Sequence, residues 1–155
     1  MGEAQGAART GGIVGLVNGS GNEISNCFNV GKVSSTGTSF LTNGGIVGSL
    51  DSGSININNC YNIAVFSQGH GSNRIGGIVG KHTGGTLTMN KCYYLKQDDT
   101  KTAIGGKEDD INQVTGCNAI SEITATILND NINNIEHTDE WQSWKLGEEG
   151  YPVFE

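Results

Sequence analysis

Gly-Gly-Ile-Val-Gly occurs three times in this chain, at residues 11–15, 44–48 and 76–80. Each copy is followed by a cysteine and an aromatic residue, and the cysteine always lies 16 residues after the first glycine. The copies begin 33 and then 32 residues apart. A fixed internal spacing within a slightly variable period predicts one structural unit stacked on copies of itself, with length differences confined to a loop.

The aligned copies share apolar columns separated by glycine, serine and asparagine. Short β-branched or aromatic segments of this kind predict strands and not helices. Three such strands in each copy predict an all-β chain, a right-handed parallel β-solenoid (β-helix) of about three turns. A sandwich of β-hairpins is the alternative, but it would not require such uniform columns. The columns are Ile13/Ile46/Ile78, Val14/Val47/Val79, Ile24/Ile57/Met89, Cys27/Cys60/Cys92, Phe28/Tyr61/Tyr93 and Val30/Ile63/Leu95.

The composition favours a folded chain that does not bind polyanions. Glycine accounts for 25 of 155 residues, proline occurs once, and charged residues make up only 16%. The net charge is −7 with nine lysines and arginines, so there is no basic face for nucleic acid or for an anionic membrane. No apolar run approaches the roughly 18 residues needed to span a bilayer, and residues 1–10 lack the apolar centre of a signal peptide.

The C-terminal third does not carry the repeat. Ser121–Asn129 predicts a short helix with Ser121 as its N-cap, and both tryptophans follow it. Because an open end of a stack exposes unpaired backbone, we expect this segment to form a small α+β cap. The predicted division is a leader or cut edge of an upstream repeat (1–10), three repeats (11–43, 44–75 and 76–104) and a capping segment (105–155).

The pentapeptide followed by Asn26-Cys27-Phe28-Asn29 or Asn59-Cys60-Tyr61-Asn62 resembles the GLUG motif. The likeness covers about residues 11–95, and residues 141–155 resemble the end of such arrays. GLUG repeats occur in bacterial surface proteins, including adhesin-like proteins and the non-catalytic part of immunoglobulin A1-specific metallopeptidases.

This resemblance implies an extracellular or bacterial cell-surface location, within a larger secreted protein. It implies no catalytic site. The peptidases use a His-Glu-x-x-His zinc motif, whereas the histidines of this chain, His70, His82 and His137, lie far apart.

The four cysteines allow two interpretations. Cys27, Cys60 and Cys92 lie in one column without any Cys-x-x-Cys pair, which does not suit a zinc site. One interpretation is that small buried side chains fill a core column. The other is a disulfide between Cys92 and Cys117 that ties the last repeat to the C-terminal segment, which an oxidising extracellular setting would permit.

The aromatic column also allows two interpretations. Tyr61, Tyr93 and the adjoining Tyr94 could contact a ligand by stacking on sugar rings, beside asparagines that could bind hydroxyl groups. Alternatively, the column packs inside the protein. The acidic runs Asp98-Asp99, Glu108–Asp110 and Glu148-Glu149 lack the alternating pattern of a calcium loop, so we expect solvated loops.

We therefore predict a non-catalytic structural or adhesive module, meaning a stalk, spacer or adhesin segment, with no catalytic, cofactor or metal residues. A carbohydrate- or host-ligand-binding domain is the alternative, with glycans or host surface proteins as partners. A β-helical polysaccharide-active enzyme is a third hypothesis, although the repeats offer no column of paired carboxylates. Upstream repeats of the parent chain are expected as partners in any case; nucleic acid and membrane insertion are not.

Overall fold

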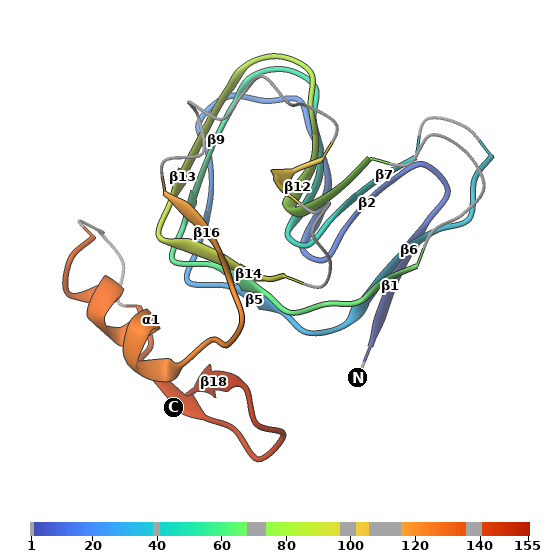
Figure 1. Cartoon of the computed structure of the whole chain (residues 1–155). Helices are drawn as coiled ribbons and strands as arrows, with labels where there is room; N and C mark the ends of the chain where they lie inside the picture. The colour runs from blue at the N-terminus through green and yellow to red at the C-terminus, as the bar shows by residue number, and fades with distance from the viewer. Residues whose placement is uncertain (1, 39–40, 68–73, 97–101, 106–115, 136–140) are drawn as a thin grey trace.

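The computed structural model describes residues 2–38, 41–67, 74–96, 102–105, 116–135 and 141–155. Within these ranges the chain consists mostly of strands, with a single helix, α1 (Ala125–Ile132) (Figure 1). The acidic runs Asp98-Asp99 and Glu108–Asp110, and the histidines His70 and His137, lie outside the described residues.

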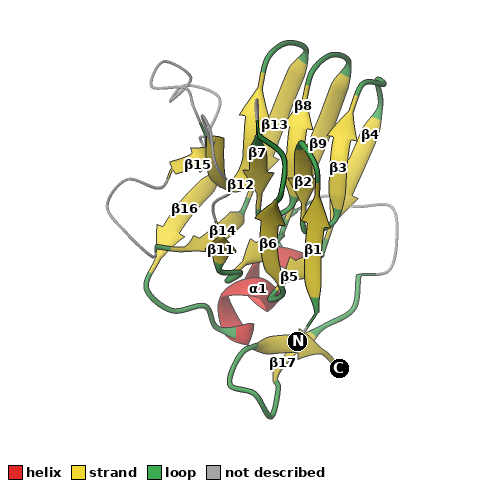
Figure 2. Cartoon of the chain, turned by 90° about the vertical axis from the view of Figure 1, so that its right-hand side faces the viewer, coloured by secondary structure: helices red, strands yellow, loops and turns green. Residues whose placement is uncertain are grey.

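Three parallel sheets each take one strand from successive repeats, which run side by side (Figure 2). The first sheet contains β4 (Asn22–Ser25), β9 (Ser54–Asn58) and β13 (Thr86–Asn90). The second contains β5 (Phe28–Asn29), β10 (Tyr61–Asn62), β14 (Cys92–Leu95) and β16 (Cys117–Ile120). The third contains β1 (Glu3–Gly6), β6 (Lys32–Ser35) and β11 (Phe66–Ser67), so residues assigned from sequence to a leader or cut edge lie in a sheet.

The fourth parallel sheet is the largest and carries the glycine-rich pentapeptides. Its order is β2-β7-β12-β8-β3, in which β12 comprises Arg74–His82, and β15 (Thr102–Ile104) also pairs with β12. One strand, β12, runs through its glycine pair without interruption and bonds to β7 before the glycines and to β8 after them. The sheet therefore curls back on itself and is nearly closed, like a barrel. Its other strands are β2 (Arg9–Gly11), β3 (Val14–Val17), β7 (Thr42–Gly44) and β8 (Val47–Leu50).

The prediction of a right-handed parallel β-solenoid of about three turns is wrong. The strands form several separate parallel sheets, and the pentapeptides build the one that is nearly closed. The physical reason is that the sheet bends at the glycine pairs. Because glycine has no side chain, the strands before the bend can lie close against the strands after it. A Cβ on Gly44 would lie 1.8 Å from the Val47 carbonyl oxygen, and one on Gly80 would lie 2.7 Å from the Asn43 carbonyl carbon.

Equivalent residues of successive repeats do lie beside one another, as the columns predict. Val47 is the Cα partner of both Val14 and Val79. The same holds for Ile57, between Ile24 and Met89, and for Tyr61, between Phe28 and Tyr93. The repeat thus fixes the pairing register, although not the number or shape of the sheets.

A left-handed residue precedes each repeat cysteine. Asn26, Asn59 and Lys91 have φ values of 52°, 47° and 55°. Asparagine adopts this conformation more readily than most residues because its short amide can hydrogen-bond locally. The kink reverses the alternation of side chains, so the cysteine enters the core between the sheets while the next residue, aromatic in every copy, points to the opposite face.

The C-terminal segment lies at the end of one sheet through β16 and covers a face of the stack with the residues that follow it. Helix α1 and the antiparallel pair β17 (Trp144–Leu146) and β18 (Pro152–Phe154) lie against the outer side of the β5-β10-β14-β16 sheet (Figure 1). The predicted helix is present, but it begins later than expected: Thr124, and not Ser121, is the N-cap and accepts a hydrogen bond from the Ile127 amide. The end of this sheet is extended by β16, which pairs with β14.

Candidate functional site

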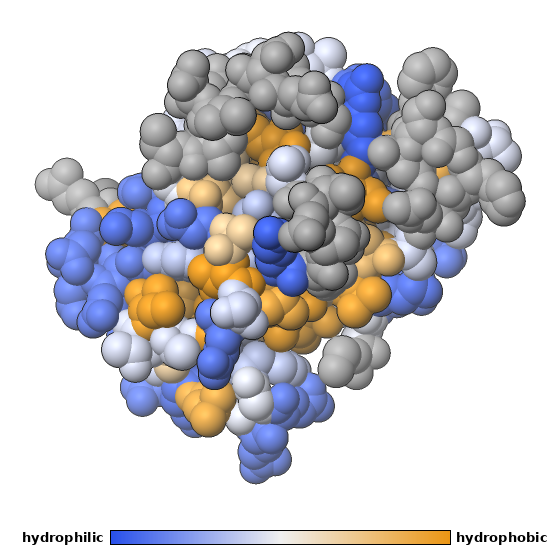
Figure 3. All heavy atoms as spheres, viewed as in Figure 1, coloured by the Kyte–Doolittle hydropathy of each residue, from blue (hydrophilic) through white to orange (hydrophobic). Residues whose placement is uncertain are grey.

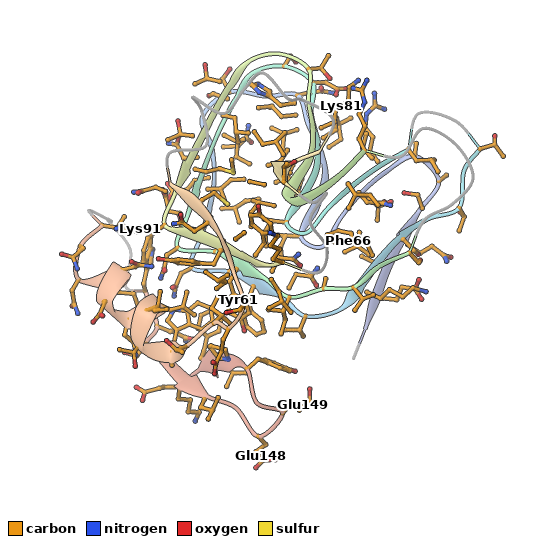
Figure 4. All side chains as sticks on the ribbon, viewed as in Figure 1. Tyr61, Phe66, Lys81, Lys91, Glu148 and Glu149 are labelled. Atoms are coloured by element: carbon orange, nitrogen blue, oxygen red, sulfur yellow. The ribbon has the colours of Figure 1, made fainter. Side chains whose placement is uncertain are left out.

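The aromatic column lies beneath the C-terminal segment. Tyr61 is 0% exposed and Tyr93 is 8% exposed, and Tyr61 lies between its sheet and β18 (Figure 4). The Phe28 and Tyr61 rings stack at 5.3 Å, and the Trp144 ring meets both edge-on, with centroids 5.6 and 5.5 Å away. The column therefore forms an aromatic core with the C-terminal segment, and its rings offer no open face to a sugar.

The polar tips of these rings are also used internally. The Tyr61 hydroxyl donates a hydrogen bond to the Pro152 carbonyl oxygen, and burial raises the pKa of this phenol. The Tyr93 hydroxyl accepts a hydrogen bond from Asn131 Nδ2 at 3.0 Å. Both tyrosines thus anchor the covering segment through the one polar atom that a buried tyrosine must satisfy.

An asparagine ladder joins the repeats to the same segment. Asn59 Nδ2 donates to Asn26 Oδ1 at 2.9 Å, and Asn131 Nδ2 donates to Asn59 Oδ1 at 3.2 Å. Trp144 Nε1 also donates to Asn26 Oδ1, at 2.9 Å. These side chains are buried, so the asparagines that could have bound sugar hydroxyls bind the protein instead.

Tyr94 lies on the other side of the sheet and is 7% exposed. Its ring covers Gly77, where an added Cβ would lie 2.3 Å from the ring. In the preceding repeats the amides of Asn29 and Asn62 cover Gly12 and Gly45 in the same way. Tyr94 therefore packs over the glycine backbone where the earlier repeats place an asparagine side chain. Burial raises the pKa of the Tyr94 hydroxyl.

Sequence reasoning missed the residues that enclose the column, chiefly Trp144, Leu128 and Asn131. Trp144 and Leu128 are 2% and 0% exposed. A usable signal was present: both faces of the Cys-aromatic segment are apolar, so one core cannot bury both. A second apolar surface, which α1 and the tryptophans supply, was therefore required.

The four cysteines form a row across the β5-β10-β14-β16 sheet. The Tyr61 amide bonds to the Cys27 carbonyl oxygen, the Tyr93 amide bonds to the Cys60 carbonyl oxygen, and Cys92 is the Cα partner of Cys117. All four are free thiols in this structure. Cys60 and Cys92 are buried, whereas Cys27 and Cys117, at the two ends, are half-buried. The predicted Cys92–Cys117 disulfide thus has its two residues on neighbouring strands and stays a prediction.

The surroundings of these thiols differ. A hydrogen bond from Cys60 lowers the pKa of Cys27 to about 7, the loss of hydration being the smaller, opposing effect. Burial raises the pKa of Cys92 to about 12 and raises those of Cys60 and Cys117. Cys27, the half-buried thiol at the N-terminal end of the row, is therefore the most easily ionised of the four.

Among the described residues, the cysteine row included, no group of three or more histidine, cysteine or acidic side chains is placed to hold a metal ion. Glu148 and Glu149 are exposed at the turn between β17 and β18, away from the aromatic core (Figure 4). In the view of Figure 3, hydrophobic residues gather near the middle of the molecule and hydrophilic ones lie over α1 and the hairpin turn.

Comparison with known proteins gives no match: no family model, no curated protein and no solved structure is significantly similar to this chain. The likeness to GLUG repeats therefore rests on the residues quoted above. Among the described residues, no helix has the length and apolar character needed to cross a membrane.

Proposed function

We propose that this chain is a non-catalytic structural module, a stalk or spacer built by stacking repeats, of a bacterial surface or secreted protein. The observation that carries this proposal is that the residue columns shared by the repeats are buried and make contacts within the protein. Ile46, Ile78, Val47 and Val79 are fully buried, and the aromatic and asparagine columns bind the C-terminal segment.

The N-terminal edge of the stack supports the same role. Ile13 is 44% exposed, while its equivalents Ile46 and Ile78 are 0% exposed. Leu16, on the edge strand β3, is 40% exposed. Because edge strands present unpaired amides and carbonyls, a further repeat of the same kind could pair there in the register that β8 and β12 already show. An upstream repeat is therefore the partner we propose.

The ligand-binding alternative loses its candidate contacts, because Tyr61, Tyr93 and Tyr94 do not present their rings to solvent. A module that acts as a spacer has a property that a binding domain or an enzyme does not need: its length can change without loss of folding. In stacked repeats, stability is close to a sum over repeats and their interfaces. Inserting repeats is therefore the sharpest test.

The experiment inserts one, two or three extra copies of residues 44–75 between residues 75 and 76, which keeps the repeat spacing. We expect each copy to lengthen the particle by about one strand spacing, roughly 4.8 Å, in small-angle X-ray scattering. We also expect the denaturation midpoint to rise with copy number, because each insert adds a further strand-pairing interface between neighbouring repeats.

The control inserts scrambled copies of the same composition, which should enlarge the particle only as an unfolded loop does. Loss of cooperative unfolding with the native copies would contradict the proposal. Saturable binding of the parent protein to one class of glycan or host matrix protein, abolished by a surface substitution that leaves the fold intact, would favour the ligand-binding alternative.

A further inference from the structure

The row of four cysteines has a chemical consequence beyond packing. Neighbouring positions of paired strands are roughly 4.8 Å apart, which lies within the Cα–Cα range of about 4.4–6.8 Å that disulfides require. Cys92 and Cys117 are direct partners in the pairing of β14 with β16. Cys27 and Cys60 also lie beside one another, because the residues on either side of them are Cα partners, Ser25 with Asn58 and Phe28 with Tyr61.

The side chains of the two middle cysteines make equivalent contacts. Cys60 Sγ lies 3.6 Å from the Ile24 carbonyl oxygen of the preceding repeat and 3.2 Å from the Asn58 carbonyl oxygen of its own, and Cys92 Sγ lies 3.2 Å from the Ile57 carbonyl oxygen of the preceding repeat. The two middle thiols thus both lie close to the backbone of the repeat before them, inside the same core.

We propose that this row is an oxidation site that forms two disulfides, Cys27–Cys60 and Cys92–Cys117, by exchange with a small-molecule disulfide such as glutathione disulfide. The accessibility of the thiols favours this pairing. Only the end thiols, Cys27 and Cys117, are half-buried and can be reached by a small disulfide, and each of them has a buried middle thiol as its neighbour. It is also the only pairing of neighbours that uses all four thiols. A Cys60–Cys92 bond would strand one thiol at each end.

The exchange balances at each end. The Cys27 thiolate attacks one sulfur of glutathione disulfide, the sulfur–sulfur bond breaks, and a glutathione thiolate leaves. Cys60 passes its proton to this thiolate and attacks Cys27 Sγ, which releases the second glutathione. Two protein thiols are oxidised, and one glutathione disulfide is reduced to two glutathione molecules. Cys117 and Cys92 react in the same way at the other end.

The test uses the full chain, reduced, freed of reductant and exposed to glutathione disulfide under native conditions. After quenching, unfolding and alkylation, trypsin places each cysteine on its own peptide, since Lys32, Lys91, Lys96 and Lys107 separate them. We expect peptide 10–32 linked to 33–74, and 92–96 linked to 108–145, with no alkylated cysteine. The same oxidation in denaturant should give mixed pairings.

Two variants separate the steps. In Cys60→Ser, Cys27 should stop as a mixed disulfide, seen as a gain of one glutathione on peptide 10–32. In Cys27→Ser, the first linkage should be lost completely, while Cys92–Cys117 still forms. Four alkylated cysteines after prolonged native oxidation would overturn the proposal, as would a Cys60–Cys92 linkage in the parent protein. Because the readout is a peptide map, its failure would leave the spacer proposal and its insertion test untouched.

Discussion

Replacing Gly48 with alanine should strongly destabilise the protein, although the change adds only one methyl group. Gly48 lies on β8, where the largest sheet folds back on itself. A Cβ at this position would lie 2.5 Å from the Gly15 carbonyl oxygen and 2.8 Å from both the backbone nitrogen and the carbonyl carbon of Thr10. Ordinary van der Waals contacts of a Cβ fall between 3.4 and 4 Å. The new methyl therefore overlaps backbone on two strands.

The size of the effect follows from what has to move. Overpacking costs about 1–3 kcal/mol when side chains can yield. Here only backbone is within reach, so we expect a loss of about 3 kcal/mol or more from the free energy of unfolding. A domain of this size loses about 2–4 °C in Tm for each kcal/mol, so Tm should fall by roughly 6–12 °C.

Gly15→Ala is the matched control, because Gly15 occupies the same position of the first repeat. Its Cβ would meet a single atom, the Arg9 carbonyl oxygen at 3.0 Å, on strands at the open edge. A compatible Gly→Ala change gains about 0.4–1 kcal/mol through the unfolded state, which offsets this contact. We expect Gly15→Ala to stay within about 1 kcal/mol of the parent in urea denaturation followed by circular dichroism. Equal midpoints for the two variants would refute the folded-sheet explanation of the pentapeptide.

Three further predictions concern the core, the aromatic contact and the thiols. Val47→Asp should leave the chain unfolded by circular dichroism at 25 °C, because a charge buried without a partner costs several kcal/mol, while Val65→Asp, at a 61% exposed position, should melt with the parent. Trp144→Phe should cost about 0.5–1.5 kcal/mol by removing one of the two hydrogen bonds to Asn26 Oδ1, which keeps Asn59 Nδ2 as a donor, and an unchanged urea midpoint would exclude that role. Burial raises the pKa of the Cys92 thiol to about 12, against about 8.5 when unfolded, so its stabilising contribution is complete below about pH 8.5 and is lost as pH rises. Unfolding free energies measured from pH 8 to 10.5 should therefore decline, less steeply in Cys92→Ala by up to about 1.4 kcal/mol per pH unit, and equal slopes would count against the burial effect.

The pairing register was predictable from the sequence, whereas the shape of the sheets was not. Identical spacing from glycine to cysteine in each copy requires equivalent residues to meet, and Val14, Val47 and Val79 do so. The same glycines are compatible with a corner or with a fold through one continuous strand. Only the packing of Gly48 and Gly80 against the backbone of other strands distinguishes these, and that contact leaves no pattern in the sequence.

The aromatic residues proposed as ligand contacts can be recognised in the sequence as a column, but their burial depends on residues far along the chain. The repeat places Phe28, Tyr61 and Tyr93 in one column, and the structure pairs them in that order, but the sequence is compatible both with packing inside the protein and with ligand contact. Their partner Trp144 lies more than 50 residues beyond Tyr93, in a segment without repeats. No local pattern links such positions, so an exposed column and a covered one have the same sequence.

The two apolar faces of the Cys-aromatic segment explain why the C-terminal segment covers a side of the stack. In each repeat, a left-handed residue directs the cysteine into the core between the sheets and the aromatic ring to the opposite face. Stacking more repeats would extend that outer column without covering it, because strands pair along their edges and not over their faces. Each module of this kind therefore needs a separate segment that covers all of its outward-facing rings.

Inserted copies of residues 44–75 would each add one tyrosine to the outer column, and α1 and β17 are too short to cover these extra rings. We thus expect the insertion series to gain stability through its strand edges while exposing one more ring per copy. Native chains with longer arrays should replace that tyrosine with a polar residue in the uncovered repeats.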